Sequence, residues 1–181
     1  MTKTLSILIG STRTNRLGAD IAAWVGEQAK TAGFDEVEFI DLKDVQLPKF
    51  DTPIPPMYAA LESEEAKAWA KTIANTSHLV VLTPEYNQSI PASLKSAIDH
   101  LYAEWNNKPT AIVSYGYMGG GKSAASHLRD ILAFLKTDLV DVNATIQLGD
   151  ATVVDNKFTS TGVTSEETDA LHNELRTLSE K

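Results

Sequence analysis

Five short apolar runs alternate with five amphipathic stretches along the chain, and no other feature constrains the fold as strongly. The apolar runs lie at residues 5–9, at Val37, Phe39 and Ile40 within residues 36–42, at 78–83, at 109–115, and within residues 139–148. Runs of this kind are typical of strands that are buried on both faces of a parallel sheet. The intervening stretches carry apolar residues at helical spacing, such as Leu17, Ile21, Trp24 and Val25. The alternation predicts an open parallel sheet with helices on both faces.

The strand count and the loop composition together predict where a ligand binds. Five strands favour the flavodoxin-like order 2-1-3-4-5, so the predicted fold is a three-layer, doubly wound α/β sheet. Helices are expected to begin near Leu17, Met57, Pro91, Ala124 and Thr164, and the second is expected to run to Ala74. Ligands of such sheets bind beyond the carboxyl ends of the strands, at the switch point between the first and third. The loops after the first, third and fourth strands should therefore meet in one crevice.

Length and composition limit the functional classes. With 181 residues, of which 43% are hydrophobic and 22% charged, residues 1–181 are expected to form a single domain. The net charge of −8 argues against nucleic acid or an anionic membrane as the main partner. The chain has no cysteine, which excludes disulfides, thiolate catalysis and zinc–thiolate sites. The apolar run before Gly10 is too short for a signal peptide or a membrane span, so we expect a cytoplasmic protein.

The first loop, residues 10–16, has the chemistry of a phosphate site. A helix that begins at Leu17 directs unpaired backbone N–H groups toward this loop, and anions bind at such helix ends. Arg13 and Arg16 add positive charge, which is otherwise unfavourable beside a helix N-terminus. The dinucleotide fingerprint G-x-G-x-x-G is absent, because Gly10 is followed by serine and threonine. The alternative is a solvated loop that happens to contain two arginines.

The second and third loops have the composition of a site for a flat ring. Residues 84–89 combine an aromatic ring, an amide and free backbone groups, although they also form a run of common turn residues. Residues 114–121 are rich in glycine, so the backbone there can approach a ligand closely. The alternative for this third loop is flexibility or a sharp turn. Convergence of the three loops is stronger support for a site than any one of them.

Three segments of the chain resemble a known family. GSTRTNRLG, TPEYNQSIPASLKSAIDHL and VSYGYMGGGKSAASHLRDIL are similar to motifs of the NADPH-dependent FMN reductase family, in the same order and across residues 4–135. The resemblance implies a flavodoxin-like fold with FMN as cofactor. Members of this family include quinone, azo-dye, chromate and free-flavin reductases.

The resemblance also assigns candidate cofactor-binding residues. It implies that the FMN phosphate lies against Ser11, Arg13, Asn15, Arg16, Leu17 and Gly18, and we add Thr12 and Thr14 of the same loop. It implies that the isoalloxazine ring lies against Pro84, Glu85, Tyr86 and Asn87, with Ser114, Tyr115 and Gly116 near its other side. The chain departs from many members at Arg16, where they have serine or glycine, and at Tyr117, where they have a second glycine.

The implied activity is FMN-dependent NAD(P)H oxidoreduction. Hydride would pass from a nicotinamide to FMN, and then to a quinone, a free flavin or another small oxidant, by a ping-pong mechanism. Because the cofactor supplies this chemistry, we name no catalytic residue. Tyr86 and Tyr117 are candidate contacts to the second substrate, and Lys122 is a candidate contact to a nicotinamide phosphate. The sequence leaves open NADPH or NADH preference, the physiological acceptor, and whether the flavin stays bound or exchanges.

Two other functions fit parts of the sequence. Gly116 to Ser123 matches the Walker A pattern G-x-x-x-x-G-K-[ST], between a predicted strand and a predicted helix. A P-loop NTPase also needs an aspartate at the end of another strand, and Asp141 and Asp41 are weak candidates for it. A flavodoxin-type electron-transfer module has the predicted fold, but flavodoxins use a phosphate loop without arginine.

The expected partners are a nicotinamide, a small electron acceptor and further copies of the chain. No metal is expected, because the histidines are scattered without ligand spacing: His78, His100, His127 and His172. The resemblance implies a homodimer or homotetramer. The proline-rich segment 43–56 and residues 102–106 are candidate subunit contacts, with Trp105 as the expected interface anchor.

Overall fold

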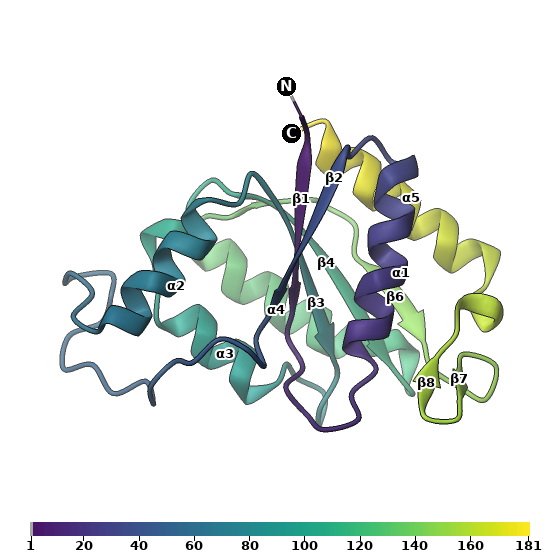
Figure 1. The fold of residues 1–181 in the computed structure, drawn as a ribbon, viewed down its shortest axis with the longest axis horizontal. Helices are drawn as coiled ribbons and strands as arrows, with labels where there is room; N and C mark the ends of the chain where they lie inside the picture. Colours follow the sequence, from purple (N-terminus) through teal and green to yellow (C-terminus); the bar gives the residue numbers. More distant parts are fainter. Residues whose placement is uncertain (1) are drawn as a thin grey trace.

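The computed structural model describes residues 2–181 and has a parallel sheet between two layers of helices (Figure 1). The strand order β2-β1-β3-β4-β5 confirms the predicted topology, and neighbouring strands are parallel. A further strand, β6, also pairs with β4. The strands of this sheet are β1 (Thr4–Ile9), β2 (Glu36–Asp41), β3 (His78–Pro84), β4 (Pro109–Gly116), β5 (Asp138–Leu139) and β6 (Ala144–Gln147).

Helices cover both faces of the sheet and bury it between two cores. The helices are α1 (Gly18–Thr31), α2 (Glu64–Ala74), α3 (Ala92–Asp99), α4 (Lys122–Phe134) and α5 (Ser165–Ser179). Helices α1 and α5 pack on one face, and α2, α3 and α4 pack on the other. Leu5 and Ile7 of β1 face the first core, whereas Leu8 faces the second. Burial on both faces explains why β1, β3 and β4 appear in the sequence as continuous apolar runs, whereas the edge strand β2 alternates apolar and charged residues and has no buried residue.

Short elements complete the chain. Single 3-10 turns lie at Ala103–Trp105, Gly119–Gly121 and Ser160–Gly162. A small hairpin, β7 (Val153–Val154) and β8 (Lys157–Phe158), lies between β6 and α5, where the sequence predicts no element. Within residues 2–181, no helix is both long enough and apolar enough to cross a membrane.

Helix α2 begins at Glu64, so the prediction of a start at Met57 is wrong. Ser63 is the N-cap, and its hydroxyl accepts a hydrogen bond from the Ala66 N–H at 3.0 Å. The preceding segment is irregular because it follows a proline-rich stretch and contains its own turn, in which the Tyr58 N–H donates to the Pro55 carbonyl. The apolar helical face therefore extends only over the residues after Ser63.

The sequence predicts that residues 139–148 contain the fifth strand, and the structure has two short strands there, β5 and β6, with an interruption between them. Thr110 of β4 pairs with Leu139, and Val113 pairs with Ala144. Two residues therefore separate these positions on β4, but four separate them on the outer segment. The Val140 N–H still donates to the Thr110 carbonyl of β4 at 2.9 Å, so the two surplus residues bend the chain out of the ladder after Val140, as in a β-bulge.

Two ionisable side chains from opposite helix layers hold this interruption. Glu174 of α5 is 1% exposed, and its carboxylate accepts hydrogen bonds from the Ile112 N–H at 3.0 Å and from the Ala144 N–H. On the other face, Arg129 of α4 donates to the Val140 carbonyl at 2.6 Å. Burial raises the pKa of Glu174 to about 8, against the lowering effect of these two N–H groups and of Arg129.

Trp105 is a core residue, so the prediction that it anchors a subunit interface is wrong. Its side chain is fully buried, and its Nε1–H donates to the Ile98 carbonyl at 3.2 Å. Its ring packs edge-on against Trp69, with 6.5 Å between the ring centroids. Because Trp105 lies in a 3-10 turn, helical spacing does not show its burial.

Candidate functional site at the carboxyl edge of the sheet

A cavity of about 290 Å³ lies beyond the carboxyl ends of β1, β3 and β4, where the strand order predicts a ligand site. All three predicted loops contribute to it. The lining residues are Ser11, Arg13, Asn15, Arg16, Leu17, Pro84, Glu85, Tyr86, Tyr115, Gly116, Tyr117, Leu148, Val153 and Asn156. The convergence inferred from composition is thus present in the folded chain.

The loop between β1 and α1 presents free hydrogen-bond donors. Leu17 is the N-cap of α1 and provides no side-chain cap, so the first N–H groups of this helix lack a side-chain acceptor. Asn15 has a positive φ of 55°, which turns the backbone into the helix. Arg13 is exposed at the surface of the loop. This set of donors suits an anion.

Arg16 is only partly satisfied by the protein. Its Nη2 forms an ion pair with Asp41, the last residue of β2, and its side chain is 12% exposed. The Nε and Nη1 atoms are buried and have no hydrogen-bond partner among residues 2–181. A buried donor without a hydrogen-bond partner lowers the stability of the fold, so a bound ligand that supplies acceptor atoms to Nε and Nη1 would be stabilising. Sequence reasoning missed Asp41 as this partner, although its place at the end of the strand beside β1 was a usable signal.

Tyr86 links the first two loops. Residues 86–89 form a tight hairpin, in which the Tyr86 N–H donates to the Ser89 carbonyl at 2.9 Å and the reverse bond measures 3.0 Å. The Tyr86 hydroxyl lies 2.8 Å from the Ser11 hydroxyl. The Arg13 guanidinium lies over the Tyr86 ring, 5.8 Å from its centroid. The phenol ring is therefore held beside the cationic loop.

The third loop contributes one buried and one exposed tyrosine. Burial raises the pKa of Tyr115, and the neighbouring Tyr86 raises it further, so Tyr115 is a neutral phenol at physiological pH. Tyr117 is 64% exposed at the cavity mouth. Ser114 is turned away from the cavity, because its fully buried hydroxyl donates to the Gly120 carbonyl at 2.9 Å.

Glu85 connects the second and third loops through its carboxylate. Its Oε2 accepts hydrogen bonds from the Ser123 N–H at 3.0 Å and the Ala124 N–H at 3.2 Å, in the first turn of α4. In a P-loop, the backbone N–H groups of this region cradle phosphates instead. The anion position of the Walker A pattern is thus occupied by a carboxylate of the protein. This arrangement argues against an NTPase.

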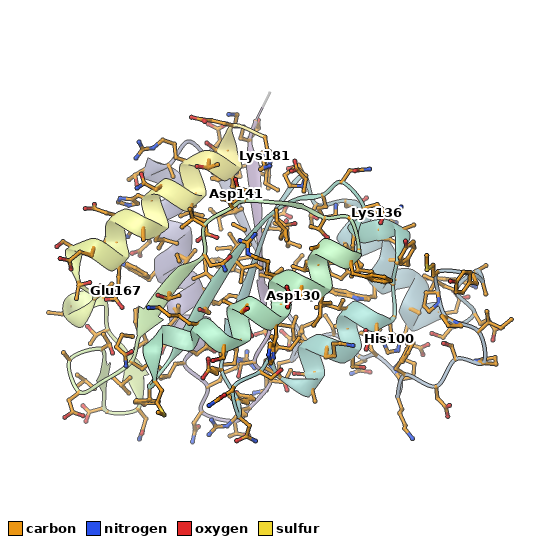
Figure 2. The ribbon with its side chains drawn as sticks, turned by 180° about the vertical axis from the view of Figure 1, so that it is seen from behind. His100, Asp130, Lys136, Asp141, Glu167 and Lys181 are labelled. Carbon is orange, nitrogen blue, oxygen red and sulfur yellow. The ribbon has the colours of Figure 1, made fainter. Side chains whose placement is uncertain are left out.

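The position of Asp141 does not support the NTPase alternative either. Asp141 follows β5, which pairs with the first residues of β4, whereas the glycine-rich loop follows the last residue of β4. Asp138, the first residue of β5, forms an ion pair with Lys181, so this end of the sheet lies beside the end of α5 (Figure 2). Asp41, the second weak candidate, is paired with Arg16. Asp41 ends a strand, but β1 and β3 separate that strand from β4, so neither aspartate lies where a P-loop needs its partner.

The lining differs in part from the residues predicted from the sequence. The predicted residues outside it are Thr12, Thr14, Gly18, Asn87, Ser114 and Lys122. The lining residues that sequence reasoning missed are Leu148, Val153 and Asn156, at the end of β6 and in the β7–β8 hairpin. The Asp155–Asn156 dipeptide between two short β-favouring pairs was the available signal for this hairpin. Across residues 2–181, no group of three or more His, Cys, Asp or Glu side chains could hold a metal.

A larger, shallow groove of about 730 Å³ lies elsewhere, between the proline-rich loop and helices α3 and α4. Figure 2 looks onto this face, with Asp130 on α4 and His100 just after α3. The lining is mostly apolar, and none of the three strand-end loops reaches it. The groove is therefore separate from the cavity at the carboxyl edge.

Comparison with known proteins gives consistent results. Residues 3–152 match the family model of the NADPH-dependent FMN reductases. An NAD(P)H-dependent FMN reductase of Schizosaccharomyces pombe is 44% identical over 138 residues, which cover 75% of this chain and 68% of the relative. A 2-hydroxy-1,4-benzoquinone reductase of a Burkholderia species is 32% identical over 149 residues, which cover 77% and 74%. The flavoenzyme FerB of Paracoccus denitrificans, an NAD(P)H:(acceptor) oxidoreductase, has the same fold, with a TM-score of 0.72, 23% identity and coverage of 99% and 96%.

Proposed function

This chain belongs to the NADPH-dependent FMN reductase family, and from that premise we propose that the cavity binds FMN and that the protein is an NAD(P)H-dependent oxidoreductase. One observation carries the proposal: the buried Nε and Nη1 atoms of Arg16 have no partner beside an uncapped helix N-terminus. A phosphate supplies the acceptor oxygens that these donors need. We propose that all of residues 1–181 act as one FMN-binding domain.

The residues around the cavity fit the two ends of FMN. Arg13, Arg16 and the N–H groups at the start of α1 would hold the phosphate, with Asp41 keeping the Arg16 guanidinium in place. The isoalloxazine ring would lie between residues 84–86 and residues 115–117. The Glu85 bond to α4 joins those two segments, so they would present a rigid pair of walls to the ring.

The protein's contribution to the reaction is positioning. Bound FMN would supply hydride chemistry between NADPH or NADH and a quinone, a free flavin or another small oxidant, and one site used in turn by donor and acceptor gives a ping-pong mechanism. Tyr117 at the exposed mouth and Tyr86 beside Arg13 would contact the second substrate. Tyr115 is a neutral phenol and Glu85 caps a helix, so neither has the role of a general base.

We also propose that the chain forms a homodimer through the groove between the proline-rich loop and helices α3 and α4. Several large side chains there are exposed, including Tyr58 at 74% and Phe134 at 70%. A contiguous apolar surface of this kind marks an interaction site, and a second copy brings a matching surface. Tyr58→Glu should convert a dimer into a monomer in light scattering. A wild-type monomer would contradict this proposal.

An absorption spectrum of the purified protein, followed by anaerobic addition of NADPH, tests the main proposal. We expect the purified protein to contain bound FMN. After NADPH is added without oxygen, this FMN should rapidly lose its visible absorbance. Bound FMN that NADPH does not reduce would indicate an electron-transfer module instead. Arg13→Met should weaken FMN binding at least about tenfold, since a charge-assisted hydrogen bond is lost. Arg176→Met, an exposed arginine on α5, is the matched control and should leave FMN binding unchanged.

A further inference from the structure

The β7–β8 hairpin forms one wall of the cavity, although it lies beyond the matched family region. The family match ends at residue 152, whereas Val153 and Asn156 line the cavity. Their side chains therefore belong to a part of the site that the family pattern does not assign. Figure 1 shows the hairpin at the same end of the molecule as the loop after β1.

The hairpin is anchored to the first turns of α1. The Phe158 N–H donates to the Asp20 carboxylate at 3.3 Å, and the Phe158 ring packs against Trp24 with 5.8 Å between centroids. Asn156 precedes Phe158 by two residues, so its backbone lies at most about 7 Å from that of Phe158. The tip of the hairpin thus lies beside the N-terminus of α1, where the phosphate donors gather.

The tip is held in one conformation. Asp155 and Asn156 form a two-residue turn, and both have positive φ, at 50° and 59°, as a type I′ hairpin requires. At the base, the Thr159 N–H donates to the Thr152 carbonyl at 2.9 Å. Gly162 packs so closely that an added Cβ would lie 2.3 Å from the Ala151 carbonyl carbon. A preorganised tip loses little conformational entropy when a ligand binds.

We infer that the side-chain amide of Asn156 donates a hydrogen bond to the phosphate of bound FMN, so that the hairpin adds a ligand to the phosphate site. Asn156 lines the cavity from an exposed position, and in the described part of the chain no hydrogen bond to protein engages its amide, so its N–H groups are available to a ligand. Two arginines, Arg13 and Arg16, share its cavity, and a neutral amide adds a further donor to them without adding charge. The inference rests on the proposal that the cavity binds FMN.

Binding of FMN and of riboflavin to the apoprotein tests the inference without reference to turnover. Asn156→Gly removes the amide and keeps the turn, because glycine adopts positive φ readily. We expect FMN to bind about tenfold more weakly to this variant, with riboflavin affinity unchanged, since riboflavin lacks the phosphate. Asn156→Asp should weaken FMN binding further through charge repulsion and again spare riboflavin. Val154→Thr, an exposed change of similar shape on the same hairpin, is the control and should alter neither affinity.

The outcomes separate this inference from the proposed function. If the wild-type apoprotein quenches no added FMN fluorescence, the proposed function itself fails. If wild type binds FMN and Asn156→Gly binds both flavins unchanged, the hairpin is not a ligand and the inference is overturned. Equal weakening of FMN and riboflavin would place the contact on the ring or ribityl chain, which also overturns the phosphate assignment. Far-UV circular dichroism of each variant establishes that the fold is retained.

Discussion

Replacing Glu174 by glutamine is expected to alter how the free energy of unfolding depends on pH. This effect should be larger than the change in unfolding free energy at any single pH. The two carboxylate oxygens accept from the Ile112 and Ala144 N–H groups at the interruption of the fifth strand. A glutamine side chain keeps one acceptor and sets an NH₂ group against the other N–H. One buried donor then loses its partner, which costs about 1–3 kcal/mol of unfolding free energy.

The pH dependence follows from the raised pKa of Glu174. The folded chain holds this proton up to about pH 8, whereas the unfolded chain releases it near the ordinary value of 4.5. Between these values the folded state binds more protons, so the free energy of unfolding of the wild type falls as pH rises. At about 1.36 kcal/mol per pH unit over 3.5 units, the loss reaches about 5 kcal/mol. The glutamine variant lacks this dependence.

Urea denaturation of the apoproteins at pH 5, 6, 7, 8 and 9 measures the difference. Glu174→Gln should be less stable than wild type at pH 5, and the gap should close and then reverse toward pH 9. Glu166→Gln makes the same chemical change at an exposed position in the first turn of α5 and should give a curve parallel to that of the wild type. Parallel curves for Glu174→Gln and wild type would refute the assignment of a buried, protonated carboxyl at this position.

Three further substitutions test the contacts that hold the site and the core. Glu85→Gln should lower the free energy of unfolding by about 1 kcal/mol in urea, because a neutral amide caps the N-terminus of α4 less well than a carboxylate; an unchanged midpoint would contradict this role. Trp105→Ala should cost about 3–5 kcal/mol as a core truncation, and a loss that depends on protein concentration would restore Trp105 to an interface. In a thermal double-mutant cycle, Ser11→Ala and Tyr86→Phe should couple by about 1 kcal/mol, whereas additive effects would show that their hydroxyls do not interact.

The parts of the structure that the sequence predicted are those with a strong periodic signal. Strands β1, β3 and β4 are buried on both faces, so their apolar runs were unambiguous, and the position of their loops followed from the topology. Trp105 could not be placed in this way, because a 3-10 turn does not follow helical spacing. The β7–β8 strands have two residues each, too few for a period to appear.

For the site, the sequence predicted the composition of the loops but not the long-range contacts between them. The composition of the loop after β1 indicated an anion site, but it did not show that Arg16 forms an ion pair with Asp41. That pairing depends on which strands are neighbours in the sheet. The role of Glu85 also depended on three-dimensional structure, because its partners lie 38 and 39 residues away in the chain. Long-range side-chain to backbone bonds of this kind leave no pattern in a single sequence.

The interruption at residues 140–143 has a consequence for aggregation. The outermost strand of a sheet exposes unpaired backbone groups that can recruit the edge of another molecule. Here that strand consists of two short pieces, β5 and β6, offset by the two surplus residues and separated by a bend. A second sheet meets no continuous ladder on this side, so it cannot extend the fold by strand addition. The side chains of Glu174 and Arg129, which hold this interruption, therefore also make this sheet edge a poor template for fibres.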